Sequence, residues 1–585
     1  MHLDRREFCV SAASAAGFFV GGRAVSADLR ASNETPSTPS GRELQADLVI
    51  IGGGLGGCAA AIAALRNGLR VVMTEETDWI GGQLTAQGVP PDEHSSIESS
   101  GANSSYREFR NRIRDYYRQN YPLTDAARSK PNLNPGNGNV SRLCVEPRVA
   151  LAVLETWLAP YRASGQLVLL TEHRAISAEV AHDRVLAVKV QSGRSGRERV
   201  LVGKYFVDAT ELGDLLPLTG TEFVTGSEAQ SETNELHAPE KADPNNQQAF
   251  TMCFAVDHLA GEDHTIDNPD EYAFWRDFVP KMTPAWPGKL LDFTYTHPRS
   301  GQPKRLGFSP TGGRTLNGAL NLWTYRRMID QTLFEPGAFP GDISLINWPQ
   351  NDYVLGNLVG VSEDESRRHI DRAKQLSLSL LYWLQTEAPR PDGGTGFPGL
   401  RLRPDIMGTE DGLAKTPYVR ESRRIRAEFT VLEEHVGRDN RAAAKHLEEH
   451  TGRTTQPIVS GLHAAEFPDS VGVGSYGIDL HPSSGGDNYI DFASLPFQIP
   501  LGALLPVRVS NLIPACKNIG TTHITSGCYR LHPVEWGIGE AAGCLASFAL
   551  NENLTPHAIR NTAKRLESFQ TFIRKQGVET DWRQT

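Results

Sequence analysis

The stretch that most constrains the fold of this chain is DLVIIGGGLGG at positions 47–57, where a run of buried-strand residues ends in a glycine-rich turn. Small residues of helical character follow. In the pattern Gly52-x-Gly54-x-x-Gly57, the first glycine permits a tight turn, the second lets a phosphate approach the backbone, and the third lets helix and strand pack closely. The next predicted strand ends at Glu75, where an acid suits ribose hydroxyls. The sequence therefore predicts a dinucleotide site at a helix N-terminus.

The size and composition of the chain limit the possible architectures and partners. A chain of 585 residues is too long for one hydrophobic core, so two or three domains are expected. The formal net charge is −10 and no long basic run occurs, so we expect no nucleic-acid partner. None of the seven cysteines is spaced as CxxC, which gives no support for a local zinc site or iron–sulfur cluster. We predict no metal.

Residues 1–27 have the pattern of a twin-arginine export signal. Arg5-Arg6 precedes a weakly apolar run, and a small-residue cleavage site follows. An uncleaved N-terminal extension is the alternative. Residues 28–45 are rich in Ser, Thr, Asn and Pro and are predicted to be a linker. No later run of about 20 apolar residues occurs, so we expect a periplasmic or secreted protein without stable membrane insertion after cleavage.

Two later junctions repeat the pairing of small and acidic residues. Gly81-Gly82-Gln83 follows soon after the ribose acid, at a point where a second glycine turn reaches a bound dinucleotide; a simple turn is the alternative. A strand predicted at 205–207 ends at Asp208 and leads through further small and acidic residues to a helix start. Both junctions favour a dinucleotide domain.

Residues 226–500 are less regular and are rich in Trp, Tyr, Pro and Gly. Helices are predicted at 367–385 and 427–450. Polar and aromatic residues recur in three clusters, at 347–353, 417–424 and 476–482. Each cluster alone is more typical of packing than of a site. We interpret this segment as a substrate domain inserted into the nucleotide domain.

The stretch from Pro514 to Gly543 is the third diagnostic feature. It leads into a helix with Pro533 at its first position and with small residues, among them Gly539, along one side. The N-terminus of such a helix would stabilise an anionic reduced flavin. A last amphipathic helix is predicted at 555–575, with a structural role.

Taken together, these features resemble bacterial FAD-dependent oxidoreductases with a glutathione-reductase-type Rossmann fold. The group is distantly similar to the fumarate-reductase flavoproteins and to the flavin-binding component of heterodisulfide reductase. The resemblance covers roughly residues 46–550 and rests on the motifs described above. The chain lacks the CxxC-type ligands of heterodisulfide reductase, so an iron–sulfur role does not carry over.

The resemblance implies an α/β fold with an α+β substrate domain. The Rossmann-type FAD domain is split in sequence into 46–225 and 501–552, the substrate or cap domain 226–500 lies between, and 553–585 forms a C-terminal helix. Ala175 opens a hairpin that lays backbone on the adenine, and the junction ending at Asp214 supports the ribityl–pyrophosphate region. The implied FAD-binding residues are Gly52, Gly54, Gly57, Glu75, Gly81, Gly82, Gln83, Ala175, Asp208, Gly213, Asp214, Asn518 and Gly539.

In such a protein the flavin N5 accepts a hydride from a small organic substrate while a base takes the proton. His523 is the first candidate for the base, because histidine titrates near neutral pH and this stretch borders the flavin. His532 is a second candidate, and Arg530 between them would bind a substrate carboxylate or an anionic flavin. Further candidates are His94, Arg423 and His481.

Three functions remain open. The first is an exported FAD oxidoreductase acting on a small molecule, such as an alcohol, an amine or a sugar-derived compound. The second is a flavin reductase fed by an external electron carrier, and the third is a non-catalytic FAD carrier or assembly protein. Only one GxGxxG occurs in a strand–helix context, so no NAD(P)H domain is predicted and the electron acceptor is oxygen, a quinone or a small carrier protein.

Overall fold

The computed structural model describes residues 43–312, 315, 318–442 and 462–582. The predicted export signal, 1–27, and nearly all of the predicted linker lie outside the described residues. Contacts between Cα atoms group residues 42–585 into one compact unit. In the part of the chain that is described, no helix is long and apolar enough to cross a membrane, and the six cysteines are buried and free.

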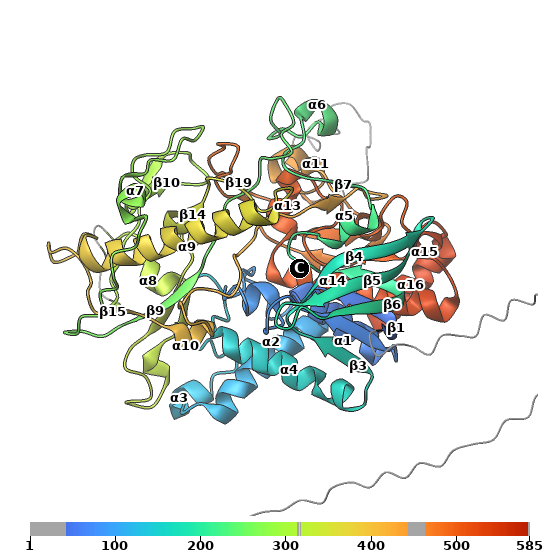
Figure 1. Cartoon of the computed structure of the whole chain (residues 1–585), viewed down its shortest axis with the longest axis horizontal. Coiled ribbons are helices and arrows are strands. Elements are labelled where there is room, and N and C mark those ends of the chain that lie inside the picture. Colours follow the sequence, from blue (N-terminus) through green and yellow to red (C-terminus); the bar gives the residue numbers. More distant parts are fainter. Residues whose placement is uncertain (1–42, 313–314, 316–317, 443–461, 583–585) are drawn as a thin grey trace, which may run out of the picture. The chain divides into compact units, whose positions relative to one another are not determined.

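A seven-stranded sheet forms the nucleotide-binding part (Figure 1). Its strand order is β3-β2-β1-β6-β5-β4, and β21 pairs with β6 beside β5. β1, β2, β3, β6 and β21 are parallel to their neighbours in this group, whereas β4 and β5 form an antiparallel hairpin on β6. The bounds are β1 Glu43–Ile51, β2 Val71–Thr74, β3 Leu167–Leu170, β4 His173–Ala181, β5 Arg184–Ser192, β6 Glu198–Asp208 and β21 Leu512–Pro514.

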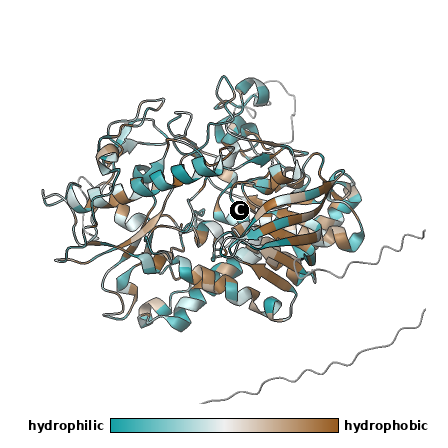
Figure 2. Ribbon diagram, viewed as in Figure 1, coloured by the Kyte–Doolittle hydropathy of each residue, from teal (hydrophilic) through white to brown (hydrophobic). Residues whose placement is uncertain are grey.

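This topology confirms the α/β class and the split nucleotide domain. β21 comes from the C-terminal part of the chain, and Ile513 pairs with Val207 of β6. β1 is buried from Leu48 to Ile51 because helices and strands cover it on both sides, as the apolar run predicted. Figure 2 shows apolar residues concentrated along these strands.

The predicted linker ends too late. Residues 43–45 belong to β1, where Glu43 pairs with Val200 and Gln45 with Val202 of β6. Pairing with β6 satisfies the backbone hydrogen-bonding groups of these residues. A polar composition does not prevent a segment from forming such a strand.

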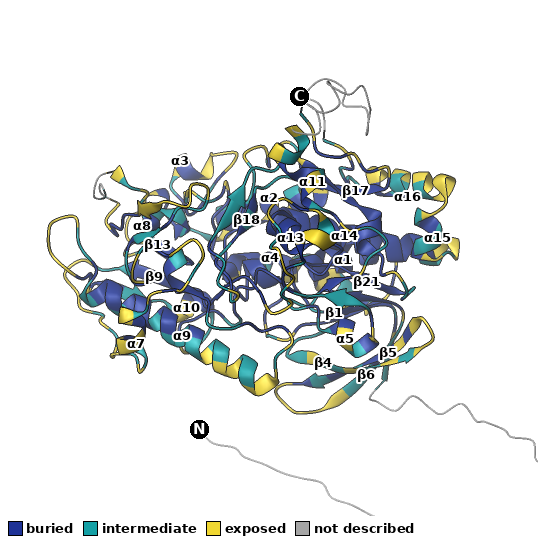
Figure 3. Ribbon diagram, turned by 90° about the horizontal axis from the view of Figure 1, so that it is seen from above, coloured by how far each residue is buried: buried dark blue, intermediate teal, exposed yellow. Residues whose placement is uncertain are grey.

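Two helices pack closely beside the sheet. α1 (Leu55–Arg66) follows the first glycine turn, and α14 (His532–Glu552) lies against it. Both are buried over nearly their whole length, which Figure 3 shows in dark blue. α14 begins one residue before Pro533. Two long helices, α2 (Ser104–Asn120) and α4 (Pro147–Ala163), pack together.

The middle of the chain builds a second sheet with its own hydrophobic core. The order is β12-β13-β9-β15, and every pair is antiparallel. The long helix α9 (Glu363–Thr386) covers the predicted helix 367–385, and its buried residues join this core together with Trp275 and Trp323. The strand bounds are β9 Phe254–His258, β12 Arg327–Ile329, β13 Ile343–Ile346 and β15 Leu400–Leu402.

Two helix predictions differ from the structure. In the segment predicted as a helix at 427–450, residues 427–432 are not helical, because the backbone N–H groups of Glu428 and Val431 donate to the C-terminal part of the chain. The described helical residues are those of the short α11 (Glu433–Val436) and, after a break at Gly437, residues 438–442. Residues 443–461 of that prediction lie outside the described residues. The last predicted helix is two helices, α15 (Pro556–Arg560) and α16 (Ala563–Lys575).

Shorter elements complete the described chain. They are α3 Asp125–Arg128, α5 Leu215–Thr219, α6 Gln230–Thr233, α7 Tyr272–Asp277, α8 Leu322–Tyr325, α10 Pro404–Met407, α13 His523–Tyr529, β7 Phe223–Val224, β8 Phe250–Thr251, β10 Thr294–Thr296, β11 Pro303–Arg305, β14 Asp352–Tyr353, β16 Arg424–Ile425, β17 Ser470–Gly474, β18 Ile478–Leu480, β19 Ile490–Phe492 and β20 Phe497–Pro500, with the 3₁₀ turns η1 Gly82–Leu84, η3 Gln331–Leu333, η4 Pro349–Asn351 and η5 Leu501–Leu504.

Candidate functional site

The glycine turn between β1 and α1 needs two of its three glycines for the geometric reasons predicted. Gly52 has φ +96°, and a Cβ there would lie 2.3 Å from the carbonyl oxygen of Ala209. A Cβ at Gly57 would lie 2.2 Å from the Gly52 oxygen, so the third glycine is required for close packing of helix and strand. Gly54 caps α1, and its added Cβ would meet its nearest atoms only at 3.3 Å.

The predicted ribose acid lies beside this turn. Glu75 Oε2 accepts the Gly53 N–H at 3.0 Å, and Oε1 accepts the Thr77 N–H at 2.8 Å. Burial raises the pKa of Glu75 to about 7. Two backbone donors therefore fix the carboxylate next to the N-terminus of α1, the position that ribose recognition needs.

The second glycine turn contacts the first through backbone atoms. Gly81 N–H donates to Gly53 O at 2.7 Å, and a Cβ at Gly82 would lie 2.9 Å from Gly54 Cα. Gly81 and Gly82 both have positive φ, +107° and +47°. The two turns pack backbone against backbone and together form one cradle. The glycines permit this contact because they have no side chain between the two backbone segments. Gln83 at its edge donates to the Arg530 carbonyl at 3.0 Å.

Asp208 anchors the junction after β6 rather than facing an open site. It is fully buried, accepts the N–H groups of Thr210 and Leu215 at 3.0 and 3.2 Å, and has a pKa raised by burial to about 7. Asn518 Nδ2 donates to the Asp208 carbonyl at 3.1 Å, which joins the C-terminal stretch to the same junction. The side chains of Asp208 and Asn518 therefore hold backbone segments of this junction in place.

The remaining predicted cofactor residues have identifiable surroundings. Gly213 has φ +67°, and Asp214 pairs with Arg423 at 3.0 Å. Ala175 lies in β4 opposite Val190. A Cβ at Gly539 would lie 2.0 Å from the oxygen of residue 56 on α1, so the thin side predicted for this helix packs against α1.

Unsatisfied polar atoms near the cradle fit a bound dinucleotide. Both amide atoms of Gln87 are buried without a hydrogen-bond partner, and so is Glu211 Oε1. Buried polar atoms are normally paired, so these atoms need a ligand or water. The glycine cradle, the ribose acid and these unpaired groups together match what FAD requires.

The carboxylate of Glu535 lies at the N-terminus of α1, where the phosphates of a dinucleotide are expected to bind. Glu535 Oε1 accepts the Gly56 N–H at 3.0 Å in the first turn of α1, and burial raises the pKa of Glu535. Ligand atoms of Glu211, Cys516 and Glu535 lie within 4.8 Å of one another. Lys517 Nζ pairs with Glu211 and lies 3.6 Å from Cys516 Sγ, so an ammonium group offsets one of the two carboxylates of this cluster.

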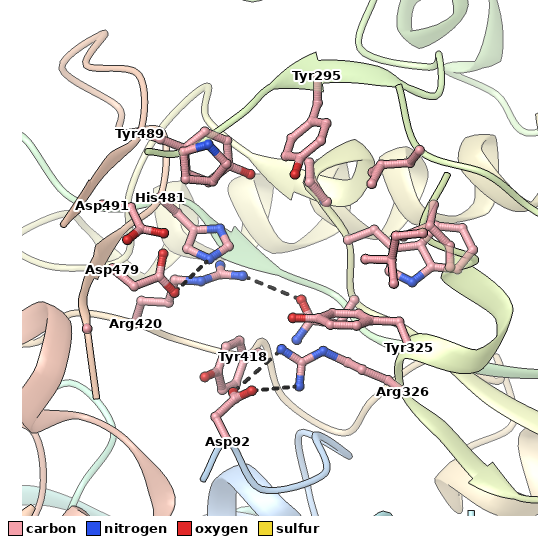
Figure 4. Close-up of a pocket in the computed structure, with 18 of the residues that line it drawn as sticks. Asp92, Tyr295, Tyr325, Arg326, Tyr418, Arg420, Asp479, His481, Tyr489 and Asp491 are labelled. Carbon is pink, nitrogen blue, oxygen red and sulfur yellow. Dashed lines mark hydrogen bonds and ion pairs between the residues drawn. The ribbon is translucent and has the colours of Figure 1, made fainter. Parts of the chain in front are cut away.

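A cavity of about 390 Å³ opens beside the cradle (Figure 4). Asp92, from the loop after η1, and Arg530, before α14, form part of its wall. The three polar–aromatic clusters of the middle segment also meet here. They contribute Asn347, Trp348, Pro349, Tyr418, Arg420, Tyr476, Gly477, Asp479 and His481. Sequence reasoning treated each cluster as packing, because nothing in the sequence shows that the three converge.

His481 has the geometry of a positioned base. Its Nδ1 lies 2.6 Å from Asp352 Oδ2, and its Nε2 lies 3.7 Å from Asp479 Oδ2 on the cavity side. Asp352 also pairs with Arg420 at 3.0 Å. Although burial acts to raise it, Arg420 and His481 hold the pKa of Asp352 below its ordinary value. An ionised Asp352 only accepts hydrogen bonds, so Nδ1 donates to it and Nε2 is the ring nitrogen left on the cavity side.

Of the three predicted catalytic residues, only Arg530 lines the cavity. Arg530 donates to the Tyr418 hydroxyl at 3.2 Å and to the Asp479 carbonyl at 3.0 Å. His523 instead pairs with buried Glu421 at 2.9 Å, and this carboxylate raises the pKa of His523 against the effect of burial. The first base candidate is thus paired with a buried carboxylate and does not line the cavity.

His532 bridges two backbone groups. Its Nδ1 accepts the Asp92 N–H at 3.2 Å and its Nε2 donates to the Val89 carbonyl at 3.2 Å. Burial lowers the pKa of His532 to about 4. It therefore holds the loop that carries Asp92. Of the further candidates, His94 bonds the Gly101 carbonyl at 3.2 Å and does not line the cavity.

Sequence reasoning missed Asp352 and Arg326 as site residues. Arg326 lines the cavity and pairs with Asp92 at 3.3 Å. Asp352 lies inside the cluster at 347–353, which the sequence singled out without a role. No pattern around Arg326 gave a signal.

The parallel sheet, the glycine cradle and the position of Glu75 are those of a Rossmann-type flavoprotein. A family model described as FAD dependent oxidoreductase matches residues 47–572. The chain belongs to this family, and FAD is its cofactor. No curated protein matches the chain.

Solved structures align with only part of the chain. L-proline dehydrogenase from P. horikoshii is 16% identical with a TM-score of 0.17, over 32% of this chain and 24% of that one. The flavin-dependent monooxygenase PieE in complex with FAD and substrate is 13% identical with a TM-score of 0.21, over 37% and 35%. The flavin-dependent brominase Bmp2 is 14% identical with a TM-score of 0.24, over 37% and 47%. The chain thus spans less than half the length of each.

Proposed function

We propose that the protein is an oxidoreductase that removes a hydride and a proton from a small polar molecule held in the cavity beside the FAD cradle. The observation that carries the proposal is the His481–Asp352 pair, at 2.6 Å, which directs an imidazole nitrogen into a cavity bounded by the two stretches that border the cofactor. FAD, when bound, supplies the hydride acceptor.

The residues of the chain supply proton transfer and placement. His481 Nε2 takes the proton of the substrate hydroxyl, and Asp352 stabilises the imidazolium that forms. Asp479, 3.7 Å from Nε2, adds a second negative charge beside the imidazolium. Arg530 is held by Tyr418 and the Asp479 backbone, so its position is fixed before substrate binds.

Anaerobic mixing of the FAD-loaded protein with alcohols, sugars, amines and hydroxy acids tests the proposal. A true substrate bleaches the visible absorbance of oxidised flavin. Bleaching by none of them, together with rapid reoxidation of photoreduced protein by organic acceptors, would favour the flavin reductase. Absence of both reactions would favour the FAD carrier. The cavity with a positioned base supports an enzyme, since a carrier needs neither.

Export by the twin-arginine route is part of the same proposal. This route transports folded proteins, which suits a chain that takes up FAD in the cytoplasm. Cell fractionation tests it: the double substitution Arg5→Lys and Arg6→Lys is expected to retain the FAD-loaded protein in the cytoplasm, whereas unchanged periplasmic or secreted protein would contradict it.

A further inference from the structure

The lining of the cavity carries more positive than negative side chains. Its charged residues are the four arginines Arg299, Arg326, Arg420 and Arg530 and the three aspartates Asp92, Asp479 and Asp491, and no lysine or glutamate occurs among the described lining residues. Asp352, which pairs with Arg420, lies behind the lining. Its side chain is only 2% exposed, and its oxygens already accept hydrogen bonds from Thr251, Arg420 and His481. At the wall itself, an acidic ligand therefore meets one guanidinium more than it meets carboxylates.

Arg326 is a buried arginine without a short hydrogen bond. Its closest acceptor among the described residues is Asp92 Oδ1 at 3.3 Å, and the Pro90 carbonyl and Asp92 Oδ2 follow at 3.4 and 3.5 Å. Charge-assisted hydrogen bonds of a guanidinium group are usually about 2.7–2.9 Å long. Arg420, in contrast, donates to the Ala249 carbonyl at 2.7 Å. Arg326 thus keeps donor capacity that the protein does not use.

Further donors lie beside Arg326 at one end of a strand pair. Arg326 directly precedes β12, and Asn347 and Trp348 directly follow β13, the antiparallel neighbour of β12. The Leu345 N–H donates to the Arg326 carbonyl at 3.1 Å, which holds the two strand ends together. Arg420 Nη2 donates to Asn347 Oδ1 at 3.4 Å, so the Asn347 amide turns its donor Nδ2 away from Arg420. We call Arg326, Asn347, Trp348 and Arg420 the donor wall.

The buried lining groups that lack a hydrogen-bond partner are donors. They are Asn347 Nδ2, Trp348 Nε1 and the Nε atoms of Arg326, Arg420 and Arg530, and each of these residues is at least nine-tenths buried. The one acceptor among the described lining atoms of this kind, Asp92 Oδ1, is ion-paired with Arg326. A carboxylate only accepts hydrogen bonds, and its two oxygens match the fork of a guanidinium group. An ammonium group only donates and would leave these donors unpaired.

The acidic lining residues of the middle segment lie on another side of the cavity. Asp479 of β18 and Asp491 of β19 are direct neighbours across an antiparallel strand pair. Figure 4 shows both beside His481, away from Arg326. Each already pairs with an arginine of the lining, Asp491 at 3.2 Å and Asp479 at 3.5 Å. A hydroxyl group suits this side, because it can donate to a carboxylate or to the imidazole.

We infer that the cavity binds a small hydroxy acid, whose carboxylate lies on the donor wall and whose hydroxyl group points toward His481. This substrate class rests on the proposed function for the location of the substrate site. The arginines and unpaired donors select the carboxylate, and the proposed base receives the hydroxyl proton. Binding of the carboxylate thereby also orients the carbon that loses the hydride.

Equilibrium binding to the FAD-loaded protein tests this substrate class apart from turnover. The flavin is photoreduced under anaerobic conditions, so that it cannot oxidise a bound compound. Binding of lactate, glycerate and gluconate is then measured at pH 7 by calorimetry, each acid against its own neutral amide. In at least one series the acid is expected to bind about tenfold more tightly than the amide, or better. A smaller preference in every series, or no binding by any of the acids and amides, would overturn the inference.

Substitution of Arg326 tests the donor wall. Arg326→Gln is expected to weaken binding of the acid about tenfold and to change binding of the amide less than about threefold. Arg326→Lys keeps the charge and is expected to bind the acid more tightly than Arg326→Gln does. Arg367→Gln is the matched control, because Arg367 lies on exposed α9 and pairs with Asp364 at the same 3.3 Å that separates Arg326 from Asp92. Equal losses for acid and amide in Arg326→Gln, or no loss for the acid, would contradict the inference.

Asp92→Asn acts in the opposite direction and keeps the test decisive if Arg326→Gln fails to retain FAD. The substitution removes the carboxylate that competes for Arg326, while His532 still holds the backbone of residue 92. Binding of the acid is expected to tighten several-fold relative to the amide. Weaker or unchanged relative binding of the acid would contradict the inference.

The proposed oxidation and the substrate class fail in distinguishable ways. If hydroxy acids bind to the donor wall but never bleach the oxidised flavin, the substrate site stands as a binding site and the oxidation is wrong. If no hydroxy acid binds while a different compound bleaches the flavin, the oxidation stands and the substrate class is wrong.

Discussion

His481 Nδ1 lies 2.6 Å from Asp352 Oδ2, although the two residues are 129 positions apart in the chain. β14 carries Asp352, and His481 directly follows β18, so two short strands of the middle segment build the pair. The pair fixes the tautomer of the imidazole and directs Nε2 toward the cavity. The proposed function therefore assigns the base to the middle segment rather than to the C-terminal stretch.

We expect His481→Asn to slow flavin reduction by substrate about 10²–10⁴-fold, the usual contribution of a general base, while the FAD spectrum is retained. Rapid mixing under anaerobic conditions measures the rate. His523→Asn is the comparison, because His523 is the base expected from sequence and pairs with Glu421 outside the cavity. A similar loss in His523→Asn, with normal rates in His481→Asn, would assign the base to His523.

Glu535→Gln is expected to tighten FAD binding by roughly tenfold, because the carboxylate competes with phosphate for the Gly56 N–H and repels it. Quenching of flavin fluorescence on titration of the apoprotein measures the affinity. Glu552→Gln, at the exposed end of the same helix, controls for net charge. Weaker binding in Glu535→Gln would show instead that the carboxylate supports the cofactor site.

Gly539→Ala is expected to lower the free energy of unfolding by about 3 kcal/mol, because its Cβ would lie 2.0 Å from the α1 backbone. Gly537→Ala, half a turn away, would place its Cβ 3.5 Å from Ile499, an ordinary contact. Gly537→Ala is expected to change the free energy of unfolding by no more than about 1 kcal/mol, since alanine favours the helix. Denaturant titration compares the two. Equal effects would mean that α1 and α14 are not packed as described.

Acid is expected to destabilise the protein partly through His532. Its pKa in the folded protein is about 4, below the ordinary 6.5, so the neutral form stabilises the fold above pH 6.5 and this contribution is lost as the pH falls toward 4. Between pH 7.5 and 4.5 the loss amounts to about 2.5 kcal/mol.

His532→Asn isolates this contribution, because the Asn oxygen accepts the Asp92 N–H and does not titrate. Denaturant titrations at both pH values are compared between the variant and the wild type. Glu75, Asp208 and Glu235, whose pKa values are raised to about 7, act in the opposite direction but equally in both proteins. An identical pH dependence in variant and wild type would contradict the assignment.

The sequence by itself determined the cofactor half of the protein. The tight turn at Gly52, the close packing at Gly57 and the position of Glu75 beside the turn could be predicted, because they follow from local backbone geometry and a fixed chain distance between strand ends. The return of the chain to this domain at 501–552 was expected from the family resemblance, and in the structure β21 pairs with β6 just before Asn518. These features depend on residues close in sequence or on a recurring topology.

Only the tertiary structure decided the substrate half. His481, Asp352 and Arg420 belong to three separate clusters, and their contacts depend on how short strands and loops pack around a second core. Loop packing has no sequence period from which to predict it. For the same reason His523 and His532 were predicted as catalytic candidates, whereas the fold pairs one with Glu421 and places the other between two backbone groups.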